Sequence, residues 1–354
     1  MNIIRRITAG LESGHAAVIT SDVNRFYATG FSSSAGTLFI TKKRAYFFTD
    51  ARYYEKAVDA VSGCEVILQD DWAEQAANIF ISHGIKLVSI ENKTMTVRGL
   101  TRYIERFPDI EFDSSSWLSD IIEKQRIIKT EEELRNIETA QRITERAFTR
   151  ILDKLEPGLT ERQIATLLTY YILELGADDI AFPIIAASGK NSAAPHAHPT
   201  NKQVEDGDFL ILDFGAVYNG YRSDMTRTVG IGSVSDEMRR VYNAVLGAHG
   251  DALKALRPDI SGKLADNVAR STLEAWGYDK YFGHGLGHGV GLEVHEAPTL
   301  SQKSDSTLRE GMVVTVEPGV YIPGSFGVRI EDMAYITAEG CINLTKTPKA
   351  LICK

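Results

Sequence analysis

The stretch FLILDFGAVYNGYRSDMTRTV, residues 209–229, decides the fold of the larger part of this chain. Two apolar runs flank an Asn-Gly dipeptide, which is the strongest short-range signal for a β-hairpin with a two-residue turn. This turn places Asp213 opposite Thr226, and Asp224 lies two residues from that partner. Asp213 and Asp224 therefore share one face of the hairpin, with backbones about 7 to 8 Å apart. If their side chains point toward each other, they could share a metal ion.

A second hairpin, MVVTVEPGVYIPGSFGVRIEDMAYI, occupies residues 312–336. Glu317 and Glu331 are symmetric about Gly324, so an odd-numbered loop makes them face each other. Pro318 interrupts the first strand of this hairpin and removes one backbone donor there. The expected register therefore depends on the loop.

The two hairpins close two copies of one repeated pattern. Thr130 and Thr160 open two successive helices in the first copy, and Ser235 and Ser261 do so in the second. These starts are separated by 105 residues (130 to 235) and 101 residues (160 to 261). We expect two similar halves packed face to face, with a crevice between the hairpins.

Residues 1–125 have a different pattern, and at about 150 residues per domain a chain of 354 residues predicts two domains. Short β-rich runs alternate with helical patterns, which predicts an α/β domain followed by a second domain over residues 126–354. The expected strands begin near residues 16, 37, 45, 65 and 87, and the expected helices cover 51–60, 71–83 and 96–107.

The charge and cysteine content exclude several functions. With 39 basic and 47 acidic residues the net charge is -8, which repels nucleic acid and anionic lipid surfaces. No stretch approaches the roughly 18 apolar residues of a membrane helix, and no signal-type segment opens the sequence. The three cysteines lack disulfide or metal-type spacing. These features predict a cytoplasmic protein without nucleic-acid or membrane partners.

Four acidic side chains on apolar strands need an explanation, because unpaired buried charges are costly. Each one alone could pair with a nearby arginine (Arg222, Arg227 or Arg329) or face solvent. Four together in mirrored hairpins, with one histidine from GHGLGHGVGLEVHE at 283–296, instead favour a site for two divalent cations. Oxygen-rich ligation with one imidazole suits Mn²⁺, Zn²⁺, Fe²⁺ or Co²⁺.

Other catalytic motifs are missing. The sequence contains no GxxxxGK[ST], GxGxxG or GxSxG, and HEAPT at 295 lacks the second histidine of the zinc-protease helix. The glycines at 283–291 are instead typical of a strand that a backbone or substrate approaches closely.

The motifs LDFGAVYNGYRSDMTRT at 212, GHGLGHGVGLEVHE at 283, EPG at 317 and RIED at 329 resemble those of the pita-bread metallopeptidases, specifically the aminopeptidase P and prolidase group. TGFSSSAGTLFIT at 29 and TDARYYEKA at 49 resemble the amino-terminal domain of that group. The resemblance implies a creatinase/prolidase-like α/β N-terminal domain and an α+β, pseudo-twofold pita-bread catalytic domain.

The resemblance also implies a ligand set. Asp213 and Asp224 would bind one metal ion, Asp224 and Glu331 would bridge the pair, and His288 and Glu317 would complete the second site. Manganese is the first expectation, with cobalt, zinc or iron as alternatives. Two such ions would activate a water molecule and polarise the scissile carbonyl.

Further residues take roles by the same resemblance. His196 would lie near the scissile bond and assist the leaving nitrogen, and His295 would hold the substrate carbonyl. Glu317 would also accept a proton from the water. His284 would belong to the pocket for the proline side, and Arg329 is a candidate for binding the substrate. His198 and His249 receive no role.

The leading hypothesis is a dinuclear peptidase that releases the N-terminal residue from short peptides with proline in second position, as aminopeptidase P does. A prolidase restricted to Xaa-Pro dipeptides is the alternative, and it would need a cationic group for the free carboxylate. Creatinase-type hydrolysis and a non-catalytic peptide-binding module are disfavoured because the five-ligand set is complete. The resemblance further suggests a homodimer.

Overall fold

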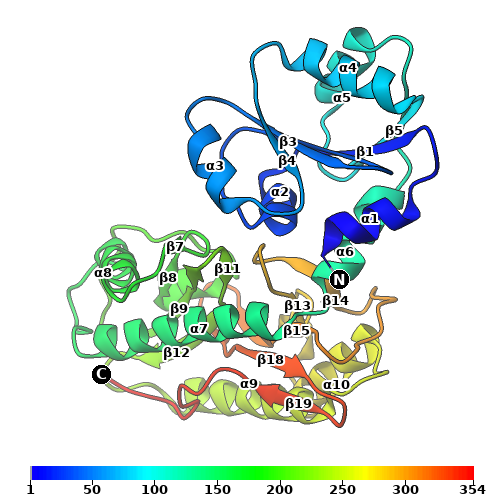
Figure 1. The fold of residues 1–354 in the computed structure, drawn as a ribbon. Coiled ribbons are helices and arrows are strands. Elements are labelled where there is room, and N and C mark those ends of the chain that lie inside the picture. The colour runs from blue at the N-terminus through cyan, green and yellow to red at the C-terminus, as the bar shows by residue number, and fades with distance from the viewer. Residues whose placement is uncertain (1) are drawn as a thin grey trace. The chain divides into compact units, whose positions relative to one another are not determined.

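The computed structural model describes residues 2–354 and divides the chain into two compact units, Met1–Arg126 and Ile127–Lys354. We call these the N-terminal and C-terminal units (Figure 1). No described helix is both long enough and apolar enough to cross a membrane.

The N-terminal unit is built on a mixed six-stranded sheet with the order β4-β3-β2-β1-β5-β6. Strands β1 and β2, and β2 and β3, pair antiparallel, whereas β1–β5, β3–β4 and β5–β6 are parallel. The strands are β1 (His15–Ile19), β2 (Thr37–Thr41), β3 (Ala45–Thr49), β4 (Glu65–Leu68), β5 (Leu87–Ile90) and β6 (Glu111–Asp113).

Helices cover both faces of this sheet because side chains alternate along each strand. Ala17 and Ile19 of β1 join one core with residues of α1, α2, α3 and α6, while Ala16 and Val18 join the other with residues of α4 and α5. The helices are α1 (Ile3–Gly10), α2 (Asp22–Thr29), α3 (Tyr54–Ala60), α4 (Trp72–His83), α5 (Val97–Arg106) and α6 (Trp117–Arg126). The sequence prediction missed α1, α2, α6 and β6.

The C-terminal unit contains the two predicted copies. The first consists of α7 (Glu131–Leu152), α8 (Glu161–Glu174), β7 (Asp179–Ile180), β8 (Ile185–Ser188), β9 (Phe209–Phe214), β10 (Ala216–Tyr218), β11 (Tyr221–Arg222) and β12 (Met225–Gly230). The second consists of α9 (Asp236–Ala255), α10 (Gly262–Ala275), β13 (Gly287–Gly289), β14 (Glu296–Leu300), β15 (Val313–Val316), β16 (Gly319–Ile322), β17 (Phe326–Arg329), β18 (Asp332–Ile336) and β19 (Cys341–Asn343).

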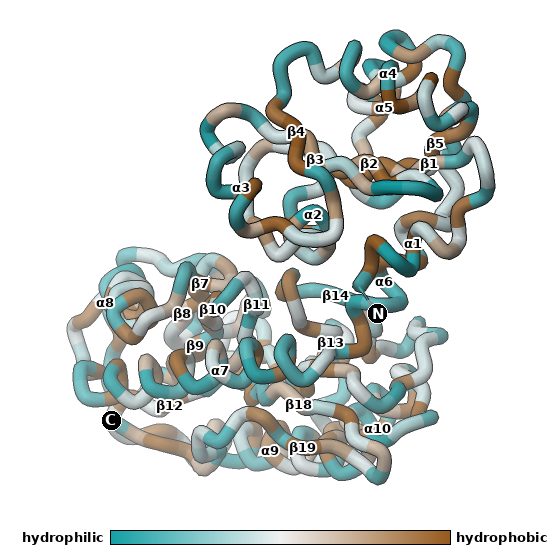
Figure 2. Tube along the Cα trace, viewed as in Figure 1, coloured by the Kyte–Doolittle hydropathy of each residue, from teal (hydrophilic) through white to brown (hydrophobic). Residues whose placement is uncertain are grey.

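The helices of each copy begin where their caps predict. The side chains of Thr130 and Thr160 accept the expected backbone hydrogen bonds and both form complete capping boxes, while Ser235 and Ser261 cap α9 and α10. Figure 2 shows hydrophilic and hydrophobic residues alternating along α7, as expected for a helix with one buried stripe. Helices α7 and α8 pack in one core and α9 and α10 in another.

The first hairpin keeps the predicted register, and the second has the odd-numbered loop under which Glu317 and Glu331 face each other. Tyr218 pairs with Tyr221, and Asp213 pairs with Thr226. In the second hairpin, the pairs Gly319–Arg329 and Val316–Asp332 are each symmetric about Gly324. Positions 317 and 331 therefore lie opposite each other where the ladder is interrupted.

Candidate metal and peptide site

A pocket of about 470 Å³ in the C-terminal unit gathers the acidic residues of both hairpins. Its walls combine apolar side chains with histidines, one arginine and four carboxylates. They are lined by Phe182, Pro183, Ile185, Pro195, His196, Ala197, His198, Asp213, Asp224, His284, Gly285, Gly287, His288, Val294, His295, Thr299, Ser301, Glu317, Arg329 and Glu331. The nine residues to which the sequence analysis gave a metal-binding, catalytic or substrate-binding role all line this pocket.

The acidic residues reach this pocket because both hairpins are interrupted there. The ladder of the first hairpin is interrupted at Gly215, between β9 and β10, and on the opposite strand at residues 223–224, between β11 and β12. A Cβ atom on Gly215, opposite Asp224, would lie 1.9 Å from the carbonyl oxygen of Ser223. Glycine is therefore required where the two strands approach each other.

Asp224, His288 and Glu331 each offer a ligand atom within 4.8 Å of the other two, and these three residues could hold a metal ion. The Nε2 atom of His288 lies 3.8 Å from Asp224 Oδ2 and 3.3 Å from Glu317 Oε1. Thr226 donates from Oγ1 to Glu331 Oε2 at 2.7 Å, which joins the two hairpins directly.

Two of the four carboxylates already have a basic partner. Arg329 Nη2 donates to Asp213 Oδ2 at 2.5 Å, and the His288 ring lies beside Glu317. Burial alone would raise the pKa of Glu317, but the His288 hydrogen bond lowers that pKa to about 2. The explanation that a nearby arginine pairs with an acidic residue therefore holds for Asp213.

Asp224 and Glu331 are compensated less, since His288 Nε2 comes only within 3.8 Å of Asp224 and the pKa of both carboxyl groups stays raised. Burial, followed by repulsion from Glu331 and Asp213, raises the pKa of Asp224 well above its ordinary value. Burial and repulsion from Glu317 and Asp213 do the same to the pKa of Glu331. Positive charge is thus missing at the place where these two carboxylates meet.

The donor set fits a divalent cation. Asp213 Oδ1 is buried and has no hydrogen-bond partner, so one lone-pair-bearing oxygen remains for a ligand. Carboxylate oxygens with a single imidazole match the preferences of Mn²⁺ and related ions. The unpaired oxygen and the two less compensated carboxylates make metal binding the physical explanation for the cluster.

The glycine-rich segment behaves as the sequence predicted, although only Gly287–Gly289 is a strand. A Cβ atom on Gly287 would lie 2.1 Å from the carbonyl oxygen of Thr315 on the neighbouring strand. Thr315 also accepts from the backbone of His288 at 3.1 Å. The absence of a side chain at position 287 therefore lets His288 approach the acidic strand.

His284 is a neutral ring with both nitrogens in use. Its Nδ1 lies 2.8 Å from the carbonyl oxygen of Gly285, which can only accept, so Nδ1 carries the proton. Its Nε2 then accepts from the hydroxyl of Tyr321 at 3.0 Å. Burial lowers the pKa of His284, so the ring presents an uncharged surface to the pocket.

Arg329 is buried and lines the same pocket. Its Nε donates to Thr226 Oγ1 at 3.1 Å, and Nη1 donates to Pro195 O at 3.2 Å and to the Tyr321 hydroxyl at 2.7 Å. Together with the bond to Asp213, four of its five N–H groups are occupied by protein atoms. The hypothesis that Arg329 binds a substrate carboxylate therefore does not fit this geometry.

The remaining histidines differ in position. His295 stacks edge-on against His288 with ring centroids 4.3 Å apart, and burial, followed by the charge of His288, lowers its pKa. His196 lines the pocket on the loop after β8, and so does His198, for which the sequence suggested no role. His249 is buried on α9 and does not line the pocket.

Sequence reasoning missed Tyr321, Thr226 and Thr315 as partners of the site residues. Two signals were available: Thr226 stands opposite Asp213 in the first hairpin, and Thr315 precedes Glu317 by two residues on the same strand. The contact of Thr226 with Glu331 crosses from one copy of the repeat to the other, so no local pattern indicates it.

Comparison with known proteins now decides the family. Residues 135–338 match the model of metallopeptidase family M24, and residues 11–128 match that of the creatinase/prolidase N-terminal domain. The chain belongs to metallopeptidase family M24. As an M24 protein it combines the creatinase-type N-terminal domain with the pita-bread catalytic domain, so the expected fold class is confirmed, and its family chemistry uses divalent metal ions.

Relatives of this M24 peptidase include proteins named for proline-containing substrates. A Xaa-Pro dipeptidase of Pyrococcus horikoshii is 38% identical and aligns over 95% of this chain and 94% of its own. The solved structure of a Xaa-Pro dipeptidase from Bacillus anthracis is 39% identical, with a TM-score of 0.95 over 99% of both chains. An X-Pro aminopeptidase structure from Thermotoga maritima is 36% identical, with a TM-score of 0.92 over 98% of this chain and 100% of that chain.

Proposed function

We propose that this M24 peptidase hydrolyses the peptide bond before proline in short Xaa-Pro substrates, with dipeptides as the preferred length. The observation that carries this proposal is one pocket that holds four carboxylates and His288 beside a neutral, largely apolar wall. Relatives named Xaa-Pro dipeptidase support the preference for dipeptides.

Two divalent ions are proposed to bind Asp213, Asp224, His288, Glu317 and Glu331, with Mn²⁺ first and Co²⁺, Zn²⁺ or Fe²⁺ as alternatives. Four carboxylates against two dications leave the cluster close to neutral once the ions bind. A bound divalent ion lowers the pKa of a coordinated water and polarises a substrate carbonyl.

The surrounding residues would handle protons and orientation. Glu317 is held ionised by His288, with its pKa near 2, so it is available as a proton acceptor. His295, whose pKa is lowered, would hold the substrate carbonyl oxygen, and His196 would assist protonation of the leaving nitrogen.

The proline residue of the substrate determines which surface the pocket must offer on that side. The nitrogen of an Xaa-Pro bond carries no N–H, so the pocket requires no acceptor there and must accommodate a ring. The uncharged His284 ring and the side chains of Phe182 and Pro183 offer such a surface.

One observation favours an aminopeptidase that accepts longer peptides. Among the described residues that line the pocket there is no lysine, and the one arginine, Arg329, is largely occupied by protein partners. A free dipeptide carboxylate would therefore rely on a histidine.

The test is hydrolysis of Ala-Pro, Ala-Pro-Ala and Ala-Ala by protein that has been stripped with a chelator and refilled with Mn²⁺, Co²⁺ or Zn²⁺. We expect turnover of Ala-Pro above that of the tripeptide, and little turnover of Ala-Ala. Turnover of the tripeptide alone would establish the aminopeptidase, and no turnover with any metal would refute the proposal. The homodimer and the cytoplasmic location stay predictions from the sequence.

A further inference from the structure

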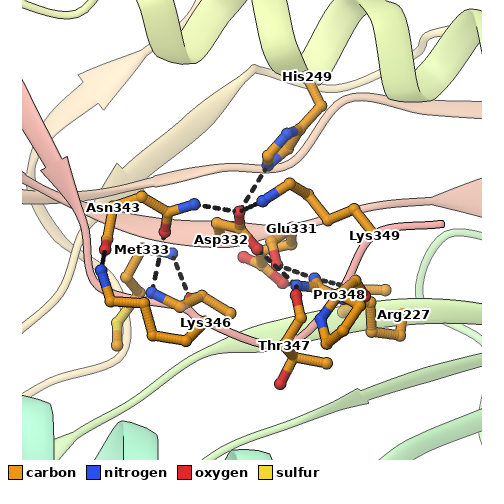
Figure 3. A network of polar contacts seen from close by, with 12 residues as sticks. Arg227, His249, Glu331, Asp332, Met333, Asn343, Lys346, Thr347, Pro348 and Lys349 are labelled. Carbon is orange, nitrogen blue, oxygen red and sulfur yellow. Dashed lines mark hydrogen bonds and ion pairs between the residues drawn. The ribbon is translucent and has the colours of Figure 1, made fainter.

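A fifth carboxylate, that of Asp332, is buried directly behind the four carboxylates of the acidic cluster. Asp332 follows Glu331 in the chain and points to the opposite side of the strand, where its side chain is completely buried. It accepts from Arg227 Nη2 at 2.7 Å, Lys349 Nζ at 2.7 Å and Asn343 Nδ2 at 2.6 Å (Figure 3). His249 Nε2 lies 3.5 Å away.

Arg227 uses all five of its N–H groups on protein acceptors. Nη2 donates to Asp332 and, at 2.8 Å, to the carbonyl oxygen of Thr347, while Nε donates to the carbonyl oxygen of Pro348 at 3.2 Å. Nη1 donates to two further carbonyl oxygens, that of Thr226 at 2.9 Å and that of Glu331 at 2.6 Å. The guanidinium therefore has no capacity for any other partner.

The carbonyl oxygens of Thr226 and Glu331, which both accept from Arg227 Nη1, belong to different copies of the repeat. Thr226 lies on β12 of the first copy, and Glu331 precedes β18 of the second. Their side chains meet on the pocket side at 2.7 Å, and the backbone N–H of Glu331 donates to Thr226 O at 3.1 Å. Arg227 thus holds from behind the same two main chains whose side chains meet at the acidic cluster.

The contacts of Arg227 link β12 and the start of β18, two strands that belong to different sheets. Strand β12 stands at the edge of the sheet β12-β9-β8, whereas β18 belongs to the sheet β14-β13-β15-β18-β19. The distance between the two carboxylate-bearing hairpins is therefore not fixed by a shared ladder of backbone hydrogen bonds. A planar guanidinium with donors in a rigid fork can fix it, whereas a flexible ammonium cannot.

Stability alone explains this arrangement poorly. Burying a guanidinium and a carboxylate carries a large desolvation penalty, and replacing such a pair by apolar side chains is often neutral or stabilising. This buried pair joins the strands on both sides of the proposed cation site. We therefore expect it to fix the distance between those strands.

We propose that Arg227 and Asp332 are positioning residues that set the spacing of the two acidic hairpins and thereby the affinity of the site for divalent cations. The inference rests on the proposed function in one respect, namely that the cluster binds metal. Neither Arg227 nor Asp332 lines the pocket, and they act through the main chains of Thr226 and Glu331.

The decisive variant is Arg227→Lys, which keeps the charge but loses the fork. Mn²⁺ binding to chelator-treated protein is measured by titration calorimetry, and unfolding of the same samples is followed by circular dichroism. Substitution of a residue that holds metal ligands in place without binding the metal typically costs 10- to 100-fold in metal affinity. We therefore expect the Kd for Mn²⁺ to rise about 10-fold or more in folded Arg227→Lys protein.

Lys349→Met is the matched control. Lys349 also donates to Asp332, but it contacts neither Thr226 nor Glu331, and its side chain is 28% exposed. We expect its Kd for Mn²⁺ to stay within about threefold of that of the unmodified protein. Asp332→Asn keeps one acceptor for Arg227, and we expect an intermediate rise in Kd; it also serves if Arg227→Lys does not fold.

The outcomes separate the two proposals. If folded Arg227→Lys, or Asp332→Asn in its place, binds Mn²⁺ as tightly as the unmodified protein, the pair is purely structural and the inference is wrong. An equal loss of affinity in Lys349→Met would also overturn it, because a general weakening of the Asp332 network would then be sufficient. If the unmodified protein binds no divalent ion at all, the proposed function itself fails.

Discussion

At the scale of single residues, the four carboxylates of the pocket fall into two pairs. Asp213 and Glu317 have basic partners in Arg329 and His288, whereas Asp224 and Glu331 repel each other in a buried place. The two pairs have the same residue types, but Asp224 and Glu331 are buried whereas Asp213 and Glu317 keep part of their side chains exposed, so burial and neighbours both contribute to the difference. Burial also raises the pKa of Asp213 in spite of Arg329, but the pKa values of Asp224 and Glu331 are raised well above the ordinary range, so the shortage of positive charge is greatest at these two residues.

This localisation predicts unequal effects of two aspartate substitutions. Asp224→Ala should cost more bound metal than Asp213→Ala, because Asp224 is proposed to touch both ions and has no arginine partner. Metal content after dialysis, measured by elemental analysis, checks this. Asp213→Ala is the control of equal size, and two tightly held equivalents in Asp224→Ala would refute the assignment.

At the scale of elements, the short strand β13 determines how closely His288 approaches the acidic hairpin. It pairs with β15 through Gly289 and with β14 on its other side. Its neighbour Thr315 contacts both the backbone of His288 and the carboxylate of Glu317, at 3.1 and 3.4 Å. A strand that carried side chains here would push the imidazole away.

Gly287→Ala tests this requirement. The added Cβ would lie 2.1 Å from Thr315 O, so β13 must move, and we expect a loss of about 1–3 kcal/mol in the free energy of unfolding. Mn²⁺ binding should weaken as well. Gly283→Ala, in the same motif, meets no atom within 4 Å and should change both quantities little. Denaturant titrations of the two variants give the comparison, and equal stability would contradict it.

At the scale of the whole molecule, the net charge of -8 includes four negative charges of one buried cluster. Two divalent ions would change the balance to -4, since -8 + 4 = -4. The chain's acidity would therefore be in part a requirement of the proposed metal site. Any ligand that binds only the folded state stabilises it, by about 2.7 kcal/mol at 100 times its Kd.

Removal of metal should make stability depend on pH in a defined direction. Burial raises the pKa of Asp213, Asp224 and Glu331 above the ordinary values of 3.8 for aspartate and 4.5 for glutamate, and, in spite of burial, the pKa of His288 is raised above 6.5 by Glu317. Groups with a raised pKa bind protons more tightly in the folded state, so their contribution is full at low pH and is lost as pH rises. Burial lowers the pKa of His249 to about 4 and also lowers the pKa of His284 and His295, so the opposing effects of these histidines level off above about pH 6.5.

We therefore expect chelated protein to lose unfolding free energy as the pH rises above about 6.5, while Mn²⁺-loaded protein does not. Thermal or denaturant unfolding at several pH values, with and without Mn²⁺, measures the difference. Chelated Asp224→Ala should show a shallower slope because it lacks one raised carboxyl group. A chelated protein whose unfolding free energy does not fall above about pH 6.5 would show that the cluster carries no such protons.

Local patterns predicted much of this fold and site. Capping residues located α7, α8, α9 and α10, and the register of both hairpins followed from turn symmetry. Helices α1 and α6 were missed because each offers only a short apolar stripe, Ile3, Ile4 and Ile7 in the case of α1. Such short segments owe their helical state mainly to the sheet that they cover.

The sequence by itself determined which side chains form the acidic cluster and on which face of each hairpin they lie, because turn geometry and the period of a strand are local properties. Only the tertiary structure decided how their charges are compensated. Arg329 meets Asp213 across 116 residues, Thr226 meets Glu331 across 105, and Arg227 joins both hairpins from behind. Contacts between strands of different sheets are set by the packing of the two halves, and no local periodicity encodes that packing.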